Sequence, residues 1–242
     1  MRPDRDRPQF KNSFQEGKEM ADKKEKSRET VNNSTELVFI LDKSGSMAGY
    51  EEDSVGGFNA TIEQQKAADG KCWVSAYLFN DNAELLIDRK DLSEVPKMEK
   101  RDYRVGGCTA LIDAIGGGIR HIEEIHRYAR KEDVPAHTIF VIMTDGLENA
   151  SHRFSSSEVK KMISEKTESG WEFLFLGANI DSVETAKHFG IREERVANYK
   201  QDRRGYGASS RSVSKAVMSL RECGCVCEDW AEEVKADFKE KR

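Results

Sequence analysis

The sequence predicts an α/β fold, a doubly wound and mostly parallel central sheet with one antiparallel edge strand and helices on both faces. Short continuous apolar runs at 37–41, 138–143 and 173–176 are typical of strands that are covered on both sides. Segments with apolar residues at helical spacing separate these runs, so strands and helices alternate along the chain. The length of 242 residues leaves room for one sizeable core with appendages.

The first half of the chain supplies three predicted strands and two predicted helices. Turn-forming residues between the second and third strands predict a hairpin, which makes the third strand the antiparallel one. The expected elements are, in order, a strand at 37–41, a helix through Val55, Phe58 and Ile62, strands at 73–79 and 83–87, and a helix from Leu111 to about Arg130.

The second half supplies three more strands, each followed by a helical segment. Ser155 and Glu158 form a capping-box pattern, which predicts a helix start. The glycine-containing segment 203–207 is predicted to be a loop. The expected elements are a strand at 138–144, a helix from Ser155 to about Ser169, a strand at 171–176, a helix at 182–189, a strand at 196–199, and a final helix at about 208–220 that carries Val213, Val217 and Leu220.

Composition divides the chain into three parts. Residues 1–34 are rich in charge and poor in large apolar side chains, which predicts a disordered arm. Residues 35–222 form the predicted domain. Residues 223–242 form a cysteine-rich tail in which Trp230, Val234 and Phe238 recur at i, i+4 and i+8, and this spacing predicts a short amphipathic helix.

Charge and hydropathy exclude several classes of protein. The net charge of −5 argues against a general nucleic-acid binder. No apolar run approaches the roughly 20 residues of a membrane span, and the charged N-terminal segment lacks the apolar core of a secretory signal. The expected location is therefore the cytoplasm. Five cysteines, three of them crowded at 223–227, are unlike a disulfide framework and favour reduced thiols.

Oxygen-bearing side chains gather at the predicted carboxyl ends of strands, where doubly wound folds bind ligands. Asp42, Ser44 and Ser46 follow the first strand, Asp145 follows the strand at 138–144, and Thr109 precedes the long helix. Two carboxylates and three hydroxyls suit a hard divalent cation, and Mg²⁺ is the natural candidate, with Mn²⁺ or Ca²⁺ as alternatives. Each residue alone is also compatible with a helix cap or a turn.

These residues stand in three short motifs. They are Asp-x-Ser-x-Ser at 42–46, Gly-Gly-x-Thr at 106–109 and Thr-Asp-Gly at 144–146. In order and strand placement the motifs resemble the metal-ion-dependent adhesion site of von Willebrand factor type A (vWA) domains. The resemblance covers roughly residues 35–220 and is closest to stand-alone intracellular bacterial and phage versions.

The resemblance implies two different roles for the five residues. Ser44, Ser46 and Thr109 would bind the cation directly or nearly so, and Asp42 and Asp145 would hold it largely through water. Neutral hydroxyls leave the charge of the cation under-compensated, so an open coordination position favours a carboxylate from outside. The resulting prediction is a cation-dependent protein-binding module that is not an enzyme, whose protein partner presents Asp or Glu.

Two other functions remain open at this point. An Asp beside a divalent cation, as expected here for Asp42, also belongs to the active site of metal-dependent phosphoryl-transfer or hydrolytic enzymes. Such chemistry, however, calls for a second Asp where this chain has Ser44. Cys223, Cys225 and Cys227 would alternatively make the tail a redox or metal sensor. Near the site, Asp113 would either hydrogen-bond the cation ligands or interact with the helix dipole.

Overall fold

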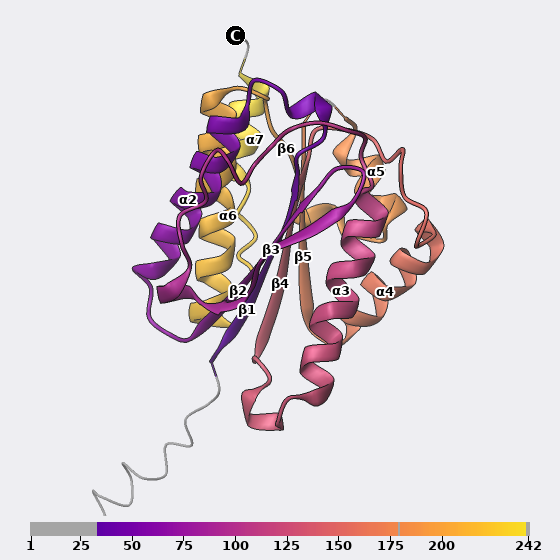
Figure 1. Cartoon of the computed structure of the whole chain (residues 1–242). Coiled ribbons are helices and arrows are strands. Elements are labelled where there is room, and N and C mark those ends of the chain that lie inside the picture. The colour runs from indigo at the N-terminus through magenta and orange to yellow at the C-terminus, as the bar shows by residue number, and fades with distance from the viewer. Residues whose placement is uncertain (1–32, 179, 241–242) are drawn as a thin grey trace, which may run out of the picture. The chain divides into compact units, whose positions relative to one another are not determined.

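A six-stranded sheet forms the centre of the computed structural model, which describes residues 33–178 and 180–240 (Figure 1). The strand order is β3-β2-β1-β4-β5-β6, and every neighbouring pair is parallel except β2 and β3. This confirms the predicted fold class. The strands are β1 (Thr35–Asp42), β2 (Cys72–Phe79), β3 (Ala83–Asp91), β4 (His137–Thr144), β5 (Trp171–Gly177) and β6 (Val196–Asn198).

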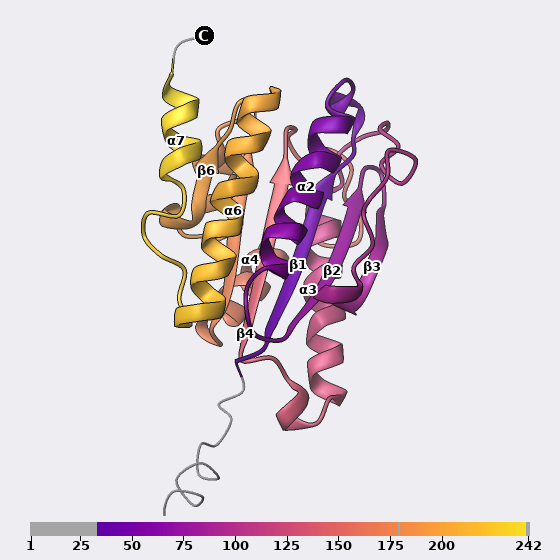
Figure 2. The same ribbon diagram turned by 90° about the vertical axis from the view of Figure 1, so that its left-hand side faces the viewer.

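Helices cover both faces of this sheet (Figures 1 and 2). On one face lie α2 (Glu51–Lys66), α6 (Arg203–Cys223) and α7 (Glu232–Lys239), and on the other lie α3 (Leu111–Tyr128), α4 (Ser156–Glu168) and α5 (Ser182–His188). Single 3-10 turns stand at Gly45–Met47, Leu92–Glu94, Lys131–Asp133 and Glu193–Arg195.

Alternation along the central strands produces two separate cores. In β1, Leu37 and Phe39 face the α2–α6 side, whereas Val38 and Ile40 face the α3–α4 side. All four side chains are almost completely buried. A strand that is covered on both faces needs apolar residues at odd and even positions alike, which is why it appears in the sequence as an unbroken apolar run.

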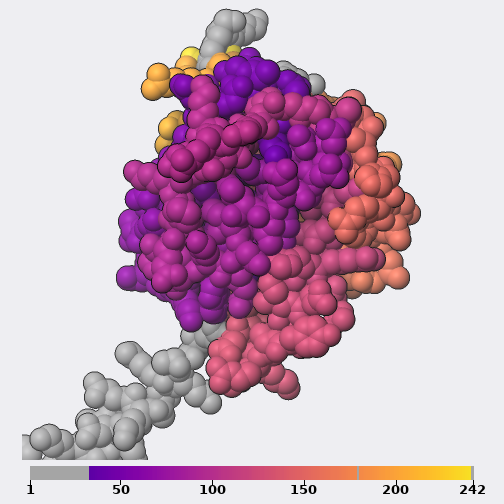
Figure 3. Space-filling view, in the orientation of Figure 1, coloured from indigo at the N-terminus to yellow at the C-terminus, as the bar shows by residue number. Residues whose placement is uncertain are grey.

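The antiparallel edge strand has a different pattern. Residues 83–86 of β3 are exposed, while Ile87 is buried against the core. In the space-filling view the purple and magenta part of the chain, which includes β3, covers much of the face (Figure 3). Charged residues dominate the second half of the strand, as is usual where an edge must not pair with another chain.

The helix predicted at about 208–220, which is α6, begins earlier than its sequence pattern indicates. Residues 203–207 are helical, so the predicted loop is wrong and α6 starts at Arg203. Asp202 caps the helix by accepting a hydrogen bond from the Gly205 N–H at 2.8 Å. Gly205 is needed inside the helix because a Cβ there would lie 2.0 Å from the Lys200 carbonyl oxygen. Close packing thus explains a glycine that propensity assigns to a loop.

The C-terminal segment packs on the domain. Trp230 and Val234 are 0 % exposed, whereas Phe238 is 43 % exposed. α7 contacts α6 and β6. The predicted arm at 1–34 lies outside the described residues except for Asn33 and Ser34. None of the described helices is long and apolar enough to cross a membrane.

Candidate metal site

Asp42 is the last residue of β1 and is almost completely buried. Its side chain is held by the Ser44 N–H at 2.7 Å and by the Thr144 hydroxyl at 2.6 Å, each donating to a different carboxylate oxygen. Asp42 is 1 % exposed. Burial raises the pKa of Asp42, and the charge of Asp145 adds to the rise, while the hydrogen bonds from Ser44 and Thr144 oppose it.

The turn after β1 carries the two serines to the Asp145 loop. Ser44 precedes the 3-10 turn but makes no capping hydrogen bond; its hydroxyl lies 3.1 Å from that of Ser46. The Ser46 hydroxyl donates to Asp145 Oδ1 at 2.5 Å. Since a hydroxyl has one proton and two lone pairs, Ser46 retains lone pairs for a cation after this bond.

Thr109 reaches the same place from the loop before α3. A Cβ at Gly146 would lie 3.1 Å from the Thr109 hydroxyl oxygen and 3.6 Å from that of Ser46. Gly146 therefore permits the Asp145 loop to approach both hydroxyls. The Thr109 loop is fixed in turn by Gly107, whose φ of +81° and proximity to Asp81 exclude a side chain. The structure thus brings the five predicted site residues together.

The loop after Asp145 is tied to the start of α3. Glu148 accepts hydrogen bonds from the N–H groups of Ile112, Ala150 and Ser151 at 2.7–2.9 Å. Asn149 and Thr109 exchange two hydrogen bonds, of 2.8 and 3.1 Å. These contacts position Thr109 beside Asp145.

Asp113 acts on the continuation of the same loop. Its carboxylate accepts hydrogen bonds from the N–H groups of residues 152–154 at 2.9–3.1 Å. In the described part of the chain, the Asp113 carboxylate is hydrogen-bonded to this loop and not to any of the five site residues. Asp113 therefore holds the loop at residues 152–154. The sequence had suggested a hydrogen bond to the cation ligands or an interaction with the helix dipole, and not this role.

Two further residues contact the site carboxylates, and the sequence assigned a role to neither. Thr144 lies inside the Thr-Asp-Gly motif and donates to Asp42. Gln201, between β6 and α6, donates its amide to Asp145 Oδ2 at 2.6 Å. The general rule that ligands bind at the carboxyl ends of strands was the available signal, because Gln201 follows the last strand. No residue motif marks it.

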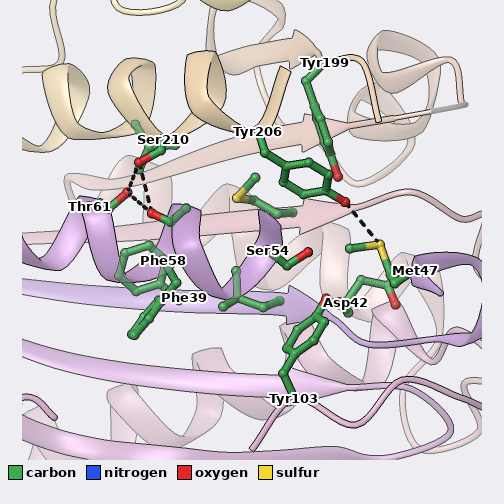
Figure 4. Close-up of a pocket in the computed structure, with 14 residues that line it drawn as sticks. Phe39, Asp42, Met47, Ser54, Phe58, Thr61, Tyr103, Tyr199, Tyr206 and Ser210 are labelled. Carbon is green, nitrogen blue, oxygen red and sulfur yellow. Dashed lines mark hydrogen bonds between the residues drawn. The ribbon is translucent and has the colours of Figure 1, made fainter. Parts of the chain in front are cut away.

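A small cavity lies beneath the site, between α2 and α6 (Figure 4). Its volume of about 30 Å³ accommodates a water molecule or two but no organic ligand. The Tyr103 hydroxyl donates to the Asp42 carbonyl oxygen, and the Tyr206 hydroxyl lies 3.8 Å from Met47 Sδ. Burial raises the pKa of Tyr206 to about 12, so this phenol stays neutral at physiological pH.

The charge balance of the site fits a cation. The partners of Asp42 and Asp145 are neutral groups, and no basic side chain pairs with either carboxylate within the described part of the chain. Both residues are at most 4 % exposed. Two buried carboxylates without a positive partner are costly, and a hard divalent cation among oxygen ligands compensates such a charge.

Softer metals fit less well. In residues 33–178 and 180–240, no three His, Cys, Asp or Glu side chains converge to hold a metal ion. The candidate site instead consists of two carboxylates and three hydroxyls, an all-oxygen set that suits Mg²⁺ or Mn²⁺. Cys223 and Cys225 are exposed, and Cys227 is partly buried. In the described part of the chain these three thiols do not converge with one another or with a His, Asp or Glu as zinc ligands would.

Replacing Asp42 by asparagine should stabilise the cation-free protein. A raised pKa in the folded state means that folding favours the protonated carboxyl, so stability falls as the pH rises through that pKa. Asparagine removes this loss and still accepts from Ser44, while Thr144 is free to donate to the Gly146 carbonyl oxygen at 3.2 Å. Thermal unfolding in chelator should give a higher midpoint for Asp42→Asn than for wild type at pH 7.

The same substitution should abolish the response to cations. Saturating Mn²⁺ should increase the free energy of unfolding of the wild type by mass action, by about 2.7 kcal/mol at one hundred times the Kd, and so raise its midpoint. Asp42→Asn should show no such rise. An equal rise in both proteins would contradict the assignment of Asp42 to the cation site.

Comparison of the sequence with protein-family models gave no match, and comparison with curated proteins gave none. Solved structures do match. A von Willebrand factor type A protein from Catenulispora acidiphila has a TM-score of 0.55 at 13 % identity over 77 % of this chain and 43 % of that one. This chain therefore spans less than half the length of that protein.

Two further structures match over more of their own length. The vWF domain of the type V pili tip protein Mfa5 from Porphyromonas gingivalis has a TM-score of 0.54 at 11 % identity and covers 76 % of this chain and 96 % of that one. Manganese-loaded TRAP protein from Plasmodium vivax has a TM-score of 0.51 at 17 % identity and covers 70 % of each. These likenesses show that the chain has the fold of vWA domains.

Proposed function

We propose that the protein is a protein-interaction module whose bound divalent cation, Mg²⁺ or Mn²⁺, accepts a carboxylate from a protein partner. Ser44, Ser46 and Thr109 hold the cation through their hydroxyl oxygens in this proposal, and Asp42 and Asp145 compensate its charge. The vWA fold supports an interaction role, and the manganese in the Plasmodium vivax TRAP structure supports a cation in a domain of this fold.

The observation that carries the proposal is the pair of buried, uncompensated carboxylates beside three hydroxyl groups. A single divalent cation balances the two negative charges, but the neutral hydroxyls next to it donate little electron density. The cation therefore remains a strong acceptor for an anionic oxygen. Ser46, an exposed residue, marks the side from which such a group reaches the site.

A display library of random peptides tests this proposal. The library is bound to immobilised protein in Mn²⁺ and eluted with chelator, which recovers only peptides whose binding depends on the cation. Asp and Glu should be enriched in the eluted peptides of the wild type, and replacement of the enriched residue by Asn or Gln should reduce binding at least tenfold, the loss of about 1.4 kcal/mol or more expected for a charged contact.

The matched control is Asp145→Ala, which removes one site carboxylate. This variant should release no enriched peptides in chelator. Enrichment of acidic residues in the variant as well, or wild-type selection without acidic residues, would contradict the proposed role of the cation.

The proposal includes no catalysis by the module itself. Position 44 is a serine, so the second carboxyl group that a phosphoaspartyl mechanism uses as general acid is not supplied there. A screen of phosphate monoesters with Mg²⁺ separates the two functions, because hydrolysis that disappears in Asp42→Asn would favour the enzyme.

A further inference from the structure

Gln201 contacts two parts of the candidate site at once. Its amide nitrogen donates to Asp145 Oδ2 at 2.6 Å and to the Ser46 carbonyl oxygen at 3.3 Å. Asp145 belongs to the loop after β4, and Ser46 belongs to the turn after β1. One side chain from a third segment, between β6 and α6, therefore bridges the two loops that carry most of the site.

The backbone around Gln201 is itself firmly held. Tyr199 N–H donates to the Gly177 carbonyl oxygen at 3.0 Å, and Asp202 N–H donates to that of Lys200 at 2.9 Å. Asp202 caps α6, and Gly205 packs directly on the Lys200 carbonyl. The amide group thus extends from a well-held corner of the backbone, so fixing it costs the rotamer entropy of the side chain without a further backbone cost.

The bridge leaves the cation ligands available. Gln201 and Ser46 each donate one hydrogen bond to Asp145, and an ionised carboxylate has about four lone-pair positions, so two remain. The amide nitrogen lies within reach of three acceptors, Asp145 Oδ2, the Ser46 carbonyl oxygen and, at 4.0 Å, Met47 Sδ, and it places no charge in the site. A neutral clamp therefore fixes the two loops without competing electrostatically with a cation.

We infer that Gln201 is a positioning residue that clamps Asp145 to the Ser46 turn and so preorganises the site for its cation. The inference rests on the proposed function, because it assigns a role in that same site. Without the clamp, part of the binding free energy must order the Asp145 side chain and the two loops, and the affinity falls accordingly.

Cation affinity and loop protection test the clamp together. Gln201→Ala should raise the Kd for Mn²⁺ in calorimetry about tenfold, the effect of one lost hydrogen bond to a charged group. In chelator, the amides of Met47 and Gly146, which are hydrogen-bonded within the two loops at 3.0 and 3.2 Å, should exchange hydrogen faster than in wild type. The cation-free thermal midpoint should change little.

Gln64→Ala is the matched control, because Gln64 is an exposed glutamine on α2. It should change neither quantity. Gln201→Met, which keeps the length of the side chain but has no donor, should behave as Gln201→Ala does and serves as the second variant if alanine lowers the midpoint.

The possible results separate the two proposals. Tighter Mn²⁺ binding by Gln201→Ala would identify the amide as a competitor and overturn the clamp. Unchanged affinity and unchanged exchange would overturn it as well while leaving the proposed function intact. A wild type that binds no Mn²⁺ would contradict the proposed function, and the clamp would then fail with it as a device for cation binding.

Discussion

Replacing Arg221 by alanine should lower the free energy of unfolding by about 3–5 kcal/mol, because several carbonyl groups would lose hydrogen bonds from a charged, buried donor. Arg221 lies in the last turn of α6 and is 2 % exposed. Its guanidinium donates to four carbonyl oxygens at the end of α2 and just beyond it, at 2.7–3.2 Å; these belong to Gln65, Ala68, Asp69 and Gly70.

The large effect follows from the kind of group that Arg221 satisfies. The last carbonyl groups of a helix have no partner inside the helix, and they carry the negative end of its dipole. A buried cation that meets them with several donors satisfies both requirements. Alanine would remove the charged donor from all four carbonyl groups, although that of Gln65 would still accept from the Ala68 N–H at 3.2 Å.

Urea unfolding measures this effect, with Arg130→Ala as the matched control. The Arg130 side chain is 75 % exposed, and its ion pair with Asp133 is on the surface, so its removal should leave stability nearly unchanged. Arg221→Lys should recover only part of the loss, because one ammonium group cannot reach all the carbonyls. Equal stability of Arg221→Ala and Arg130→Ala would refute the role assigned to the guanidinium.

Trp230→Ala should cost a similar amount, about 3–5 kcal/mol, as expected for truncation of a fully buried aromatic side chain. Trp230 is 0 % exposed, and its indole N–H donates to the Glu194 carbonyl oxygen at 2.8 Å. The substitution would therefore create a cavity beside α6 and would leave a carbonyl group without its donor.

Phe238→Ala provides the comparison within the same segment. Phe238 is 43 % exposed, so its truncation removes less buried area and should cost clearly less. Unfolding followed by circular dichroism should remain a single transition in both variants if the segment after Cys223 belongs to the cooperative unit. A separate early transition, or equal costs for the two substitutions, would mean that this segment folds apart from the domain.

Helices and strands were predictable from the sequence where their local residue pattern matches the packing around them. The capping box at Ser155 and Glu158 marked the start of α4, and both of its hydrogen bonds are present. The buried strands were visible as apolar runs because both faces of the sheet are covered. The start of α6 was not predictable from helix propensity. The glycine in its first turn is required by the close contact with the Lys200 carbonyl, and the sequence alone does not show that contact.

The candidate site divides in the same way. Its five residues stand in short motifs at strand ends, so their proximity could be predicted, and the structure brings them together. Their role as cation ligands stays a prediction. The role of Gln201 could not be predicted, because its contact with Asp145 joins residues 56 positions apart and depends on where β6 ends. No local spacing records such a contact.

The hydrogen bonds of Arg221 also bear on the time course of folding. They join positions 151 to 156 residues apart, and the entropy of closing so long a loop favours their formation late in folding. Contacts that form after the transition state slow unfolding and leave the folding rate almost unchanged. We therefore expect this arginine to set how long the folded domain persists, and not how quickly it is reached.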